Sequence, residues 1–321
     1  MYSQSQFKPA WWLRNPHLQT VWATVTRRQT KIETQRERLE LPDGDYLDLD
    51  WAGTGHGPIV LILHGMGGSI ESPYSRGFLR AITENGWRGV LMHFRGCSGE
   101  PNRLPRLYHS GETEDIAYVV QTLKNREPDT PLAAIGVSLG GSVLINWLGK
   151  HKKDKLLVAS VAISVPFELK KAANHINKGL SRFYQWYILR DLRRTIINKF
   201  KIMKAPIDFG DIERLNTFWE FDNKITAPLH GFLDVHDYYE KASCRPYLKQ
   251  IEIPTLILQA RDDPFMSPDV IPEPQELSEQ VTLEVSETGG HVGFVAGTIP
   301  WRPVYWMEQR AIEYLKEHLP A

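Results

Sequence analysis

Apolar and polar positions follow two different periods along this chain, and the two periods alternate from about residue 58 onward. Residues 59–63 (Ile-Val-Leu-Ile-Leu) form a continuous apolar run, which is typical of a strand buried on both faces. Further strands are predicted at residues 89–94, 131–137, 157–165, 255–258 and 281–285. Helical periodicity predicts helices at residues 72–85, 112–126, 141–150 and 303–319. This alternation predicts an α/β fold with a mostly parallel central sheet flanked by helices.

The first part of the chain has a different pattern. Residues 31–41 and 46–51 alternate apolar and polar side chains, which predicts an antiparallel hairpin at the edge of the sheet. Residues 1–30 contain neither period clearly, and we expect them to form an N-terminal arm packed on the core.

The α/β pattern is interrupted from about residue 166 to residue 245, a stretch too long for a loop in a compact domain. We therefore predict a core formed by residues 1–165 and 246–321, with residues 166–245 inserted as a helical lid. How this segment folds decides the depth of any pocket beneath it, and no periodicity argument settles that fold.

One helical segment of the predicted lid has an apolar stripe and a basic face. The stripe consists of Leu189, Leu192, Ile196, Ile197, Phe200 and Met203. The opposite face carries Arg190, Arg193, Arg194, Lys199, Lys201 and Lys204. We interpret this face as a solvated surface, while a basic cap over a site or a peripheral contact with anionic lipid stays open.

The amino-acid composition narrows the range of binding partners and of cellular compartments that fit this chain. The 321 residues include 38 basic and 38 acidic side chains, so the chain has no net positive charge that would attract nucleic acid. Two cysteines are too few for a disulfide framework and fit a cytoplasmic setting. Residues 1–9 are polar and do not resemble a signal peptide, and no apolar run is long enough to span a bilayer. Oligomeric state cannot be inferred.

The most informative motif is Gly-Val-Ser-Leu-Gly at residues 136–140, between a predicted strand and a predicted helix. This is the context of a nucleophile elbow, in which a sharp turn exposes a serine hydroxyl and small residues avoid collisions. The motif predicts Ser138 as a nucleophile at a helix N-terminus, which favours negative charge. On the pentapeptide alone, a structural serine in a tight turn is the alternative.

A serine hydroxyl needs a neighbouring base, and a carboxylate usually orients that base. In the chain order serine, acid, histidine, the acid should follow a late strand. Asp263 comes directly after the strand predicted at residues 255–258 and is our choice, with Asp262 as the alternative. His291, flanked by glycines after the last predicted strand, is the candidate base. His318 also follows Asp263 but lies among polar residues of the terminal helix.

Two backbone amides should complete an oxyanion hole. The N–H of Leu139 follows the nucleophile, and the N–H of Met66 lies in the Gly-rich loop after the strand at residues 59–63. That loop lacks the lysine and the glycine spacing of nucleotide-binding loops, so we do not predict a nucleotide site. Chemistry of this kind requires no cofactor and no metal. The order of these positions predicts an acyl-transfer hydrolase.

Longer stretches of the chain resemble a known family. The opening at residues 7–20 (Phe-Lys-Pro-Ala-Trp-Trp-Leu-Arg-Asn-Pro-His-Leu-Gln-Thr) is similar to that of the YheT-like hydrolases, in the AB hydrolase 4 family of the α/β-hydrolase superfamily. Segments 93–102, 108–113, 217–222 and 227–232 match as well. The resemblance implies an α/β-hydrolase fold and hydrolysis of carboxylic esters. It also places the family's charge-relay serine, aspartate and histidine on Ser138, Asp263 and His291.

The resemblance further implies that bacterial members are soluble, while several animal relatives carry an N-terminal membrane anchor and act on lipids. No such anchor is apparent here, which argues against a membrane-lipid substrate. The expected activity is therefore a serine esterase that forms an acyl-enzyme on a small-molecule ester. A thioesterase, amidase, lysophospholipase or acyltransferase with the same residues is the alternative, and a ligand-binding protein without turnover is a third.

Five further residues have more than one possible role. His64 and Arg95 follow predicted strands and are candidates for substrate contact, Arg95 through a carboxylate or phosphate. Arg95 could equally anchor Glu112 or Asp115 in a buried network, which we favour. Cys97 lacks an elbow and is not expected to be a nucleophile. The pair Trp11–Trp12 fits packing of the arm better than a membrane anchor.

Overall fold

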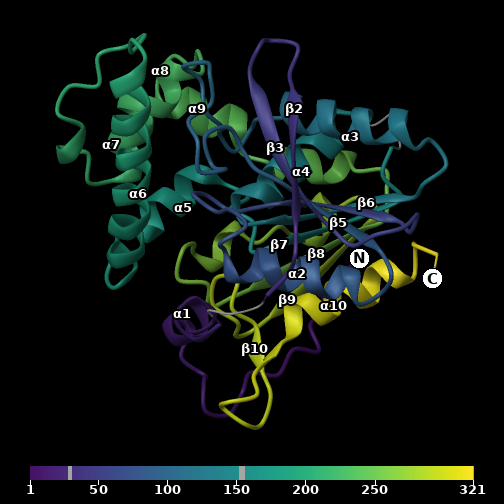
Figure 1. Ribbon diagram of the computed structural model, residues 1–321. Helices are drawn as coiled ribbons and strands as arrows, with labels where there is room; N and C mark the ends of the chain where they lie inside the picture. The colour runs from purple at the N-terminus through teal and green to yellow at the C-terminus, as the bar shows by residue number, and fades with distance from the viewer. Residues whose placement is uncertain (28–30, 152–155, 321) are drawn as a thin grey trace.

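A twisted sheet runs through the centre of the molecule, as the computed structural model shows for residues 1–27, 31–151 and 156–320 (Figure 1). In this part of the chain the sheet has nine strands in the order β1-β9-β8-β7-β6-β4-β5-β3-β2. Their bounds are β1 Tyr2–Gln4, β2 Gln35–Glu40, β3 Tyr46–Ala52, β4 Ile59–Leu63, β5 Arg88–Met92, β6 Leu132–Val137, β7 Ala159–Ile163, β8 Thr255–Ala260 and β9 Val281–Ser286.

The mostly parallel sheet predicted from the sequence is confirmed. Strands β4 to β9 pair in parallel with one another, and β5 pairs antiparallel with β3 on its other side. Strands β2 and β3 form the predicted antiparallel hairpin at one edge. Strand β1 was not predicted and extends the opposite edge, where it pairs in parallel with β9. A three-residue strand is too short to show a period, so only its pairing partner reveals it.

Each face of the sheet is covered by helices, because side chains alternate along every strand. In β4, Leu61 packs with α3 (Glu114–Arg126) and α4 (Leu139–Lys150), while Ile62 packs with α2 (Pro73–Thr83) and α10 (Trp306–Lys316). Figure 1 shows α3 and α4 on one side of the sheet and α2 and α10 on the other. All five residues of β4 are buried, as its unbroken apolar run predicts.

The segment between β7 and β8 is helical and stands at one end of the sheet, at the left in Figure 1. Its helices are α5 Leu169–Ile176, α6 Ser181–Ile202, α7 Phe218–Phe221, α8 Ala227–Leu229 and α9 Val235–Ala242. In the same segment a π-helical turn spans Asp222–Thr226, and 3-10 turns span Ile212–Arg214 and Arg245–Gln250, while two more 3-10 turns, Pro268–Val270 and Pro274–Glu276, follow β8. These helices share an apolar cluster of their own, separate from the two clusters on the sheet.

Helix α6 departs from its predicted faces. Leu189 and Ile196 of the predicted stripe are buried. Lys199, expected on the basic outer face, is also buried, because it follows Ile196 by three positions and shares that side of the helix. The outer surface near the start of α6 is instead aromatic and apolar, with Leu180, Phe183, Trp186 and Tyr187 exposed.

The N-terminal arm contains helix α1 (Pro16–Thr26), whose first turn is capped by the Asn15 side chain. Near it lies a small hairpin of β10 (Val295–Ala296) and β11 (Val304–Tyr305), as Figure 1 shows at the bottom of the view. Trp12 packs against Trp22, whereas Trp11 stays largely exposed and donates a hydrogen bond to the Thr298 carbonyl. Among the described residues, no helix is both long and apolar enough to cross a bilayer.

Candidate active site

Ser138 sits in a strained turn between β6 and α4. Its φ of 53° lies in the left-handed region, which a non-glycine residue adopts only when its surroundings impose it. The flanking glycines permit the turn. A Cβ on Gly136 would lie 2.5 Å from the Gly140 carbonyl oxygen, and one on Gly140 would lie 2.3 Å from the Leu63 carbonyl oxygen. Glycine is therefore required at both positions, as the elbow motif predicts.

Three side chains from distant parts of the chain form a hydrogen-bonded line. The Nε2 atom of His291 lies 2.9 Å from the Ser138 hydroxyl oxygen, and its Nδ1 atom lies 2.7 Å from an oxygen of Asp263. Asp263 and His291 are both buried, and the second Asp263 oxygen accepts the Phe265 N–H. The Phe265 ring also stacks on the imidazole at 3.9 Å between centroids. This geometry can move a proton from the serine to the imidazole.

Asp262, the alternative acid, points elsewhere. One of its carboxylate oxygens accepts the Gly290 N–H at 2.9 Å, and burial raises the pKa of the carboxyl. Asp262 therefore holds the loop that carries His291 and makes no hydrogen bond to the imidazole. The structure brings Asp263 to the imidazole, as the sequence argument preferred.

The loop after β4 lies directly beside the nucleophile. A Cβ on Gly65 would come within 3.3 Å of the Ser138 Cβ, so the loop that carries Met66 packs against the elbow. Leu139 opens α4, and the N–H groups of a first helical turn have no carbonyl partner within their own helix. The Tyr74 hydroxyl accepts the Gly65 N–H and braces the loop.

His64 does not occupy a position from which it could contact a substrate, contrary to our expectation. The side chain is fully buried, its Nδ1 lies 2.7 Å from the Gly65 carbonyl oxygen, and its Nε2 accepts the Phe94 N–H. Burial lowers the pKa of the imidazole to about 3, so the ring is neutral and can serve as an acceptor. His64 therefore braces the loop before Met66.

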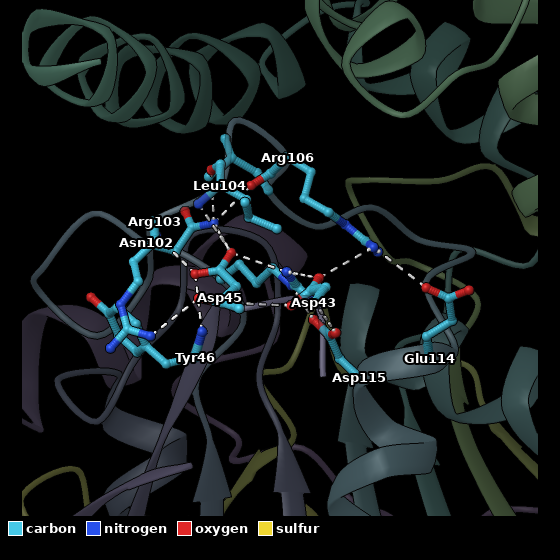
Figure 2. A network of polar contacts seen from close by, with 12 residues as sticks. Asp43, Asp45, Tyr46, Asn102, Arg103, Leu104, Arg106, Glu114 and Asp115 are labelled. Carbon is cyan, nitrogen blue, oxygen red and sulfur yellow. Dashed lines mark hydrogen bonds and ion pairs between the residues drawn. The ribbon is translucent and has the colours of Figure 1, made fainter. Parts of the chain in front are cut away.

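Arg95 is likewise turned into the protein, where it contacts three carboxylates that Figure 2 labels, Asp43, Asp45 and Asp115. Its guanidinium donates two hydrogen bonds to Asp115 and one each to Asp43 and Asp45, and it is only 3% exposed. Substrate binding by Arg95 is therefore not supported, and the buried network is the correct alternative. Asp115 is the expected partner, while Glu112 pairs with Arg106 instead. Four of its five N–H donors are thus used by carboxylates inside the protein, which leaves the guanidinium unsuited to hold a ligand's carboxylate or phosphate.

Two adjacent cavities lie in this region, and the smaller one reaches the nucleophile. The smaller, about 80 Å³, is lined by Ser138 and His291 and has apolar walls of Leu169, Ala172, Ala173, Ile176, Ile188, Phe218 and Phe265. The larger, about 350 Å³, has more polar walls that include Asn102, Tyr108, His109, Lys199 and His230. Met66, Leu139, Asp222 and Tyr238 line both cavities. One molecule could thus place an apolar chain in the cavity beside Ser138 and a polar group in the adjoining larger cavity.

Cysteine and metal chemistry are two other types of reactivity to test against the structure of this site. Burial raises the pKa of the Cys97 thiol to about 12, so the sulfur is protonated near neutral pH and is a poor nucleophile. Within the described residues, no group of three or more histidine, cysteine, aspartate or glutamate side chains is arranged to hold a metal ion.

The sequence matches a protein family and several named relatives. The profile of the α/β-hydrolase fold matches residues 58–298. A protein of Escherichia coli K12, provisionally named esterase YheT, is 43% identical over 99% of this chain and 95% of its own length. Human phospholipase ABHD3 is 30% identical over 89% of this chain and 75% of its own. A monoacylglycerol lipase of Saccharomyces cerevisiae is 32% identical over 79% of this chain and 57% of its own.

Solved structures share the fold at low sequence identity. The esterase Pf2001 of Pyrococcus furiosus superposes with a TM-score of 0.58 at 18% identity, over 91% of this chain and 95% of that one. The esterase EaEST of Exiguobacterium antarcticum gives a TM-score of 0.56 at 18% identity, over 88% of this chain and all of that one. At such identities the likeness concerns the fold alone.

Proposed function

The chain belongs to the α/β-hydrolase family, and from this premise we propose that it is a serine hydrolase that cleaves carboxylic esters. The observation that carries the proposal is the line Ser138–His291–Asp263, with 2.9 and 2.7 Å between its heteroatoms. Relatives that bear the names esterase, phospholipase and monoacylglycerol lipase support the same reaction class.

In the proposed reaction, Ser138 attacks the acyl carbonyl while His291 takes the hydroxyl proton. Asp263 accepts a hydrogen bond from Nδ1, holds the imidazole in the tautomer that leaves Nε2 free as a base, and stabilises the imidazolium. His291 then donates the proton to the departing alcohol. Water, activated by the same imidazole, hydrolyses the acyl-enzyme and restores Ser138.

The negative charge that develops on the carbonyl oxygen needs donors fixed in advance. We assign this role to the N–H groups of Met66 and Leu139, which flank Ser138 from the β4 loop and from the start of α4. Each donor of this kind accelerates the reaction by roughly 10²–10³. The bracing of the loop by His64 and Tyr74 keeps such a donor in place before substrate arrives.

Covalent labelling tests the proposal. A fluorophosphonate probe should label the protein, and Ser138→Ala should abolish both labelling and hydrolysis of p-nitrophenyl esters. Ser142→Ala is the matched control, because Ser142 lies one turn further along α4 and its hydroxyl donates to the Pro166 carbonyl. Absence of labelling in the folded wild-type protein would favour a ligand-binding protein without turnover.

A lipid ester is the second candidate substrate, and specific observations favour it. The cavity beside Ser138 is apolar, and Phe183, Trp186 and Tyr187 expose aromatic surface on the lid helix α6. The Arg190 guanidinium lies over the rings of Trp186 and Tyr187 and adds positive charge to this surface. Aromatic and basic side chains together suit contact with an anionic lipid surface. A panel of p-nitrophenyl esters, acyl-CoA thioesters and lysophospholipids would rank the alternatives, including thioesterase and acyltransferase activity.

A further inference from the structure

The loop that carries His291 has an unusual backbone. Gly290 has a φ of 61°, and the non-glycine residues Val292 and Phe294 have φ values of 55° and 44°. Residues other than glycine adopt such angles only where their surroundings impose them. The position of the imidazole therefore depends on what holds this loop from outside.

Part of that support comes from the other end of the sequence. The Thr20 hydroxyl of α1 accepts the His291 N–H at 2.9 Å while it donates to the Pro16 carbonyl at 2.8 Å. Gln19, fully buried, accepts the Val295 N–H through Oε1 and donates to the Val295 carbonyl through Nε2. Two side chains of α1 thus form hydrogen bonds with the backbone of His291 and of Val295.

The approach of α1 to this loop is too close for side chains larger than glycine. A Cβ on Gly290 would lie 2.5 Å from the Pro16 carbonyl oxygen, and one on Gly293 would lie 2.6 Å from the Gln19 carbonyl oxygen. The glycines around His291 therefore serve the contact with the arm. This contact gives a physical reason for both the Asn-Pro-His-Leu-Gln-Thr segment and the Gly-Gly-His-Val-Gly segment.

A second path joins the arm to the imidazole through the lid. The Nδ1 atom of His17 lies 3.1 Å from the Tyr184 hydroxyl oxygen, and the Tyr184 ring packs on Phe265 at 5.1 Å between centroids. Phe265 stacks in turn on His291 with an interplanar angle of 8°. The arm therefore acts on the loop backbone directly and on the ring through α6.

We propose that α1 is a positioning element for the catalytic base, with Thr20 as its positioning residue. This inference rests on the proposed function. Thr20 does not touch the reacting atoms. It fixes the peptide N–H of His291 so that the imidazole stays aligned between Ser138 and Asp263, and small misalignments of a base can cost large factors in rate.

The test compares two threonines of the same helix. The hydroxyls of Thr20 and Thr26 each donate to the carbonyl four residues earlier, but only Thr20 receives the His291 N–H. Thr20→Val should lower kcat for a short p-nitrophenyl ester by about tenfold or more, with KM nearly unchanged. Thr20→Ser keeps the hydroxyl and should restore kcat. Thr26→Val should behave as the wild type.

A spectroscopic measurement separates this inference from the proposed function. The proton in the His291–Asp263 hydrogen bond should give a low-field resonance that shifts or broadens in Thr20→Val and returns in Thr20→Ser, without substrate present. Thr20→Ala serves in place of valine if the valine variant does not fold. Equal kcat and an unchanged resonance in folded Thr20 and Thr26 variants would overturn the inference. A wild type that neither labels nor turns over would overturn the proposed function, while the resonance would still report on Thr20.

Discussion

Two adjacent carboxylates, Asp262 and Asp263, have different contacts in this site and therefore different expected roles. Asp263 is 3% exposed and contacts the imidazole, whereas Asp262 accepts a backbone N–H of the histidine loop. Local sequence favours Asp263 only by its distance from the strand end. The direction of each side chain is set by the turn after β8 and by the loop packed against it, which are tertiary features.

The two carboxylates should therefore respond differently to the same substitution. Asp263→Asn should lower kcat by about 10⁴, because an amide favours the wrong imidazole tautomer and cannot stabilise the imidazolium. Asp262→Asn keeps an oxygen for the Gly290 N–H and should change kcat far less. Steady-state hydrolysis of a p-nitrophenyl ester measures both. A larger loss in the Asp262 variant, with both proteins folded, would exchange the two assignments.

Helix α6 is tied to the core through a polar network rather than by apolar packing alone. The Lys199 ammonium donates to the backbone and side-chain oxygens of Asn102, and the Asn102 amide donates to Asp45. Burial lowers the pKa of Lys199 to about 8. Asp45 in turn binds Arg95, so the network of Figure 2 continues to the start of α3.

Asn102 connects Lys199 of α6 to Asp45, and Asn102→Ala should therefore loosen α6. The substitution removes the side-chain oxygen that accepts from the buried Lys199 ammonium and the amide that donates to Asp45, while the backbone carbonyl of residue 102 and Arg95 remain as partners. The loss of two charge-assisted hydrogen bonds should lower the free energy of unfolding by about 3 kcal/mol. Hydrogen exchange of α6 amides should accelerate. Asn125→Ala, at an exposed position of α3, is the control. Unchanged exchange in α6 would show that the network does not secure the helix.

On the scale of the whole molecule, a carboxyl group is buried between the two cavities. Asp222 lines both cavities, and its oxygens accept hydrogen bonds from the Thr226 and Tyr239 hydroxyls rather than from a cation in the described chain. Burial raises the pKa of Asp222 to about 6 from its ordinary 3.8. The folded protein therefore binds this proton more tightly than the unfolded chain.

The sign of the resulting pH dependence follows from linkage. Because the folded pKa is raised, the stabilising contribution is complete below pH 3.8 and is lost as pH rises through about 6. Compared with Asp222→Asn, the wild type should lose roughly 2 to 3 kcal/mol of stability between pH 4 and pH 7.5. Urea unfolding at both pH values measures this, with the exposed Asp129→Asn as control. A constant difference between wild type and variant would contradict it.

Comparison of the whole chain with known proteins shows the family to which it belongs, whereas other expectations remain predictions. The resemblance to the YheT-like hydrolases is confirmed by the E. coli relative, and the α/β-hydrolase fold by the family profile and the solved structures. The division into core and lid stays a prediction. The roles of Ser138, Asp263 and His291 are proposals whose geometry the structure supplies.

The sequence by itself determined two kinds of feature: local patterns of neighbouring residues, and the order in which key residues follow one another along the chain. The apolar run of β4 predicts a buried strand, and the glycines around Ser138 predict the elbow. The order serine, acid, histidine is a property of the linear chain and does not depend on how the chain folds. The strand and elbow signals depend only on the periodicity of apolar side chains and on backbone sterics, both of which are set by residues close together in the sequence.

Only the tertiary structure decided which distant groups meet. Thr20 and His291 are 271 positions apart, and the inward turn of Lys199 depends on Asn102, 97 positions earlier. The same holds for the partners of Arg95 and for β1, whose strand exists because β9 offers an edge. No short-range period encodes such pairs, because each residue gains its partner only once the intervening chain has closed around the sheet.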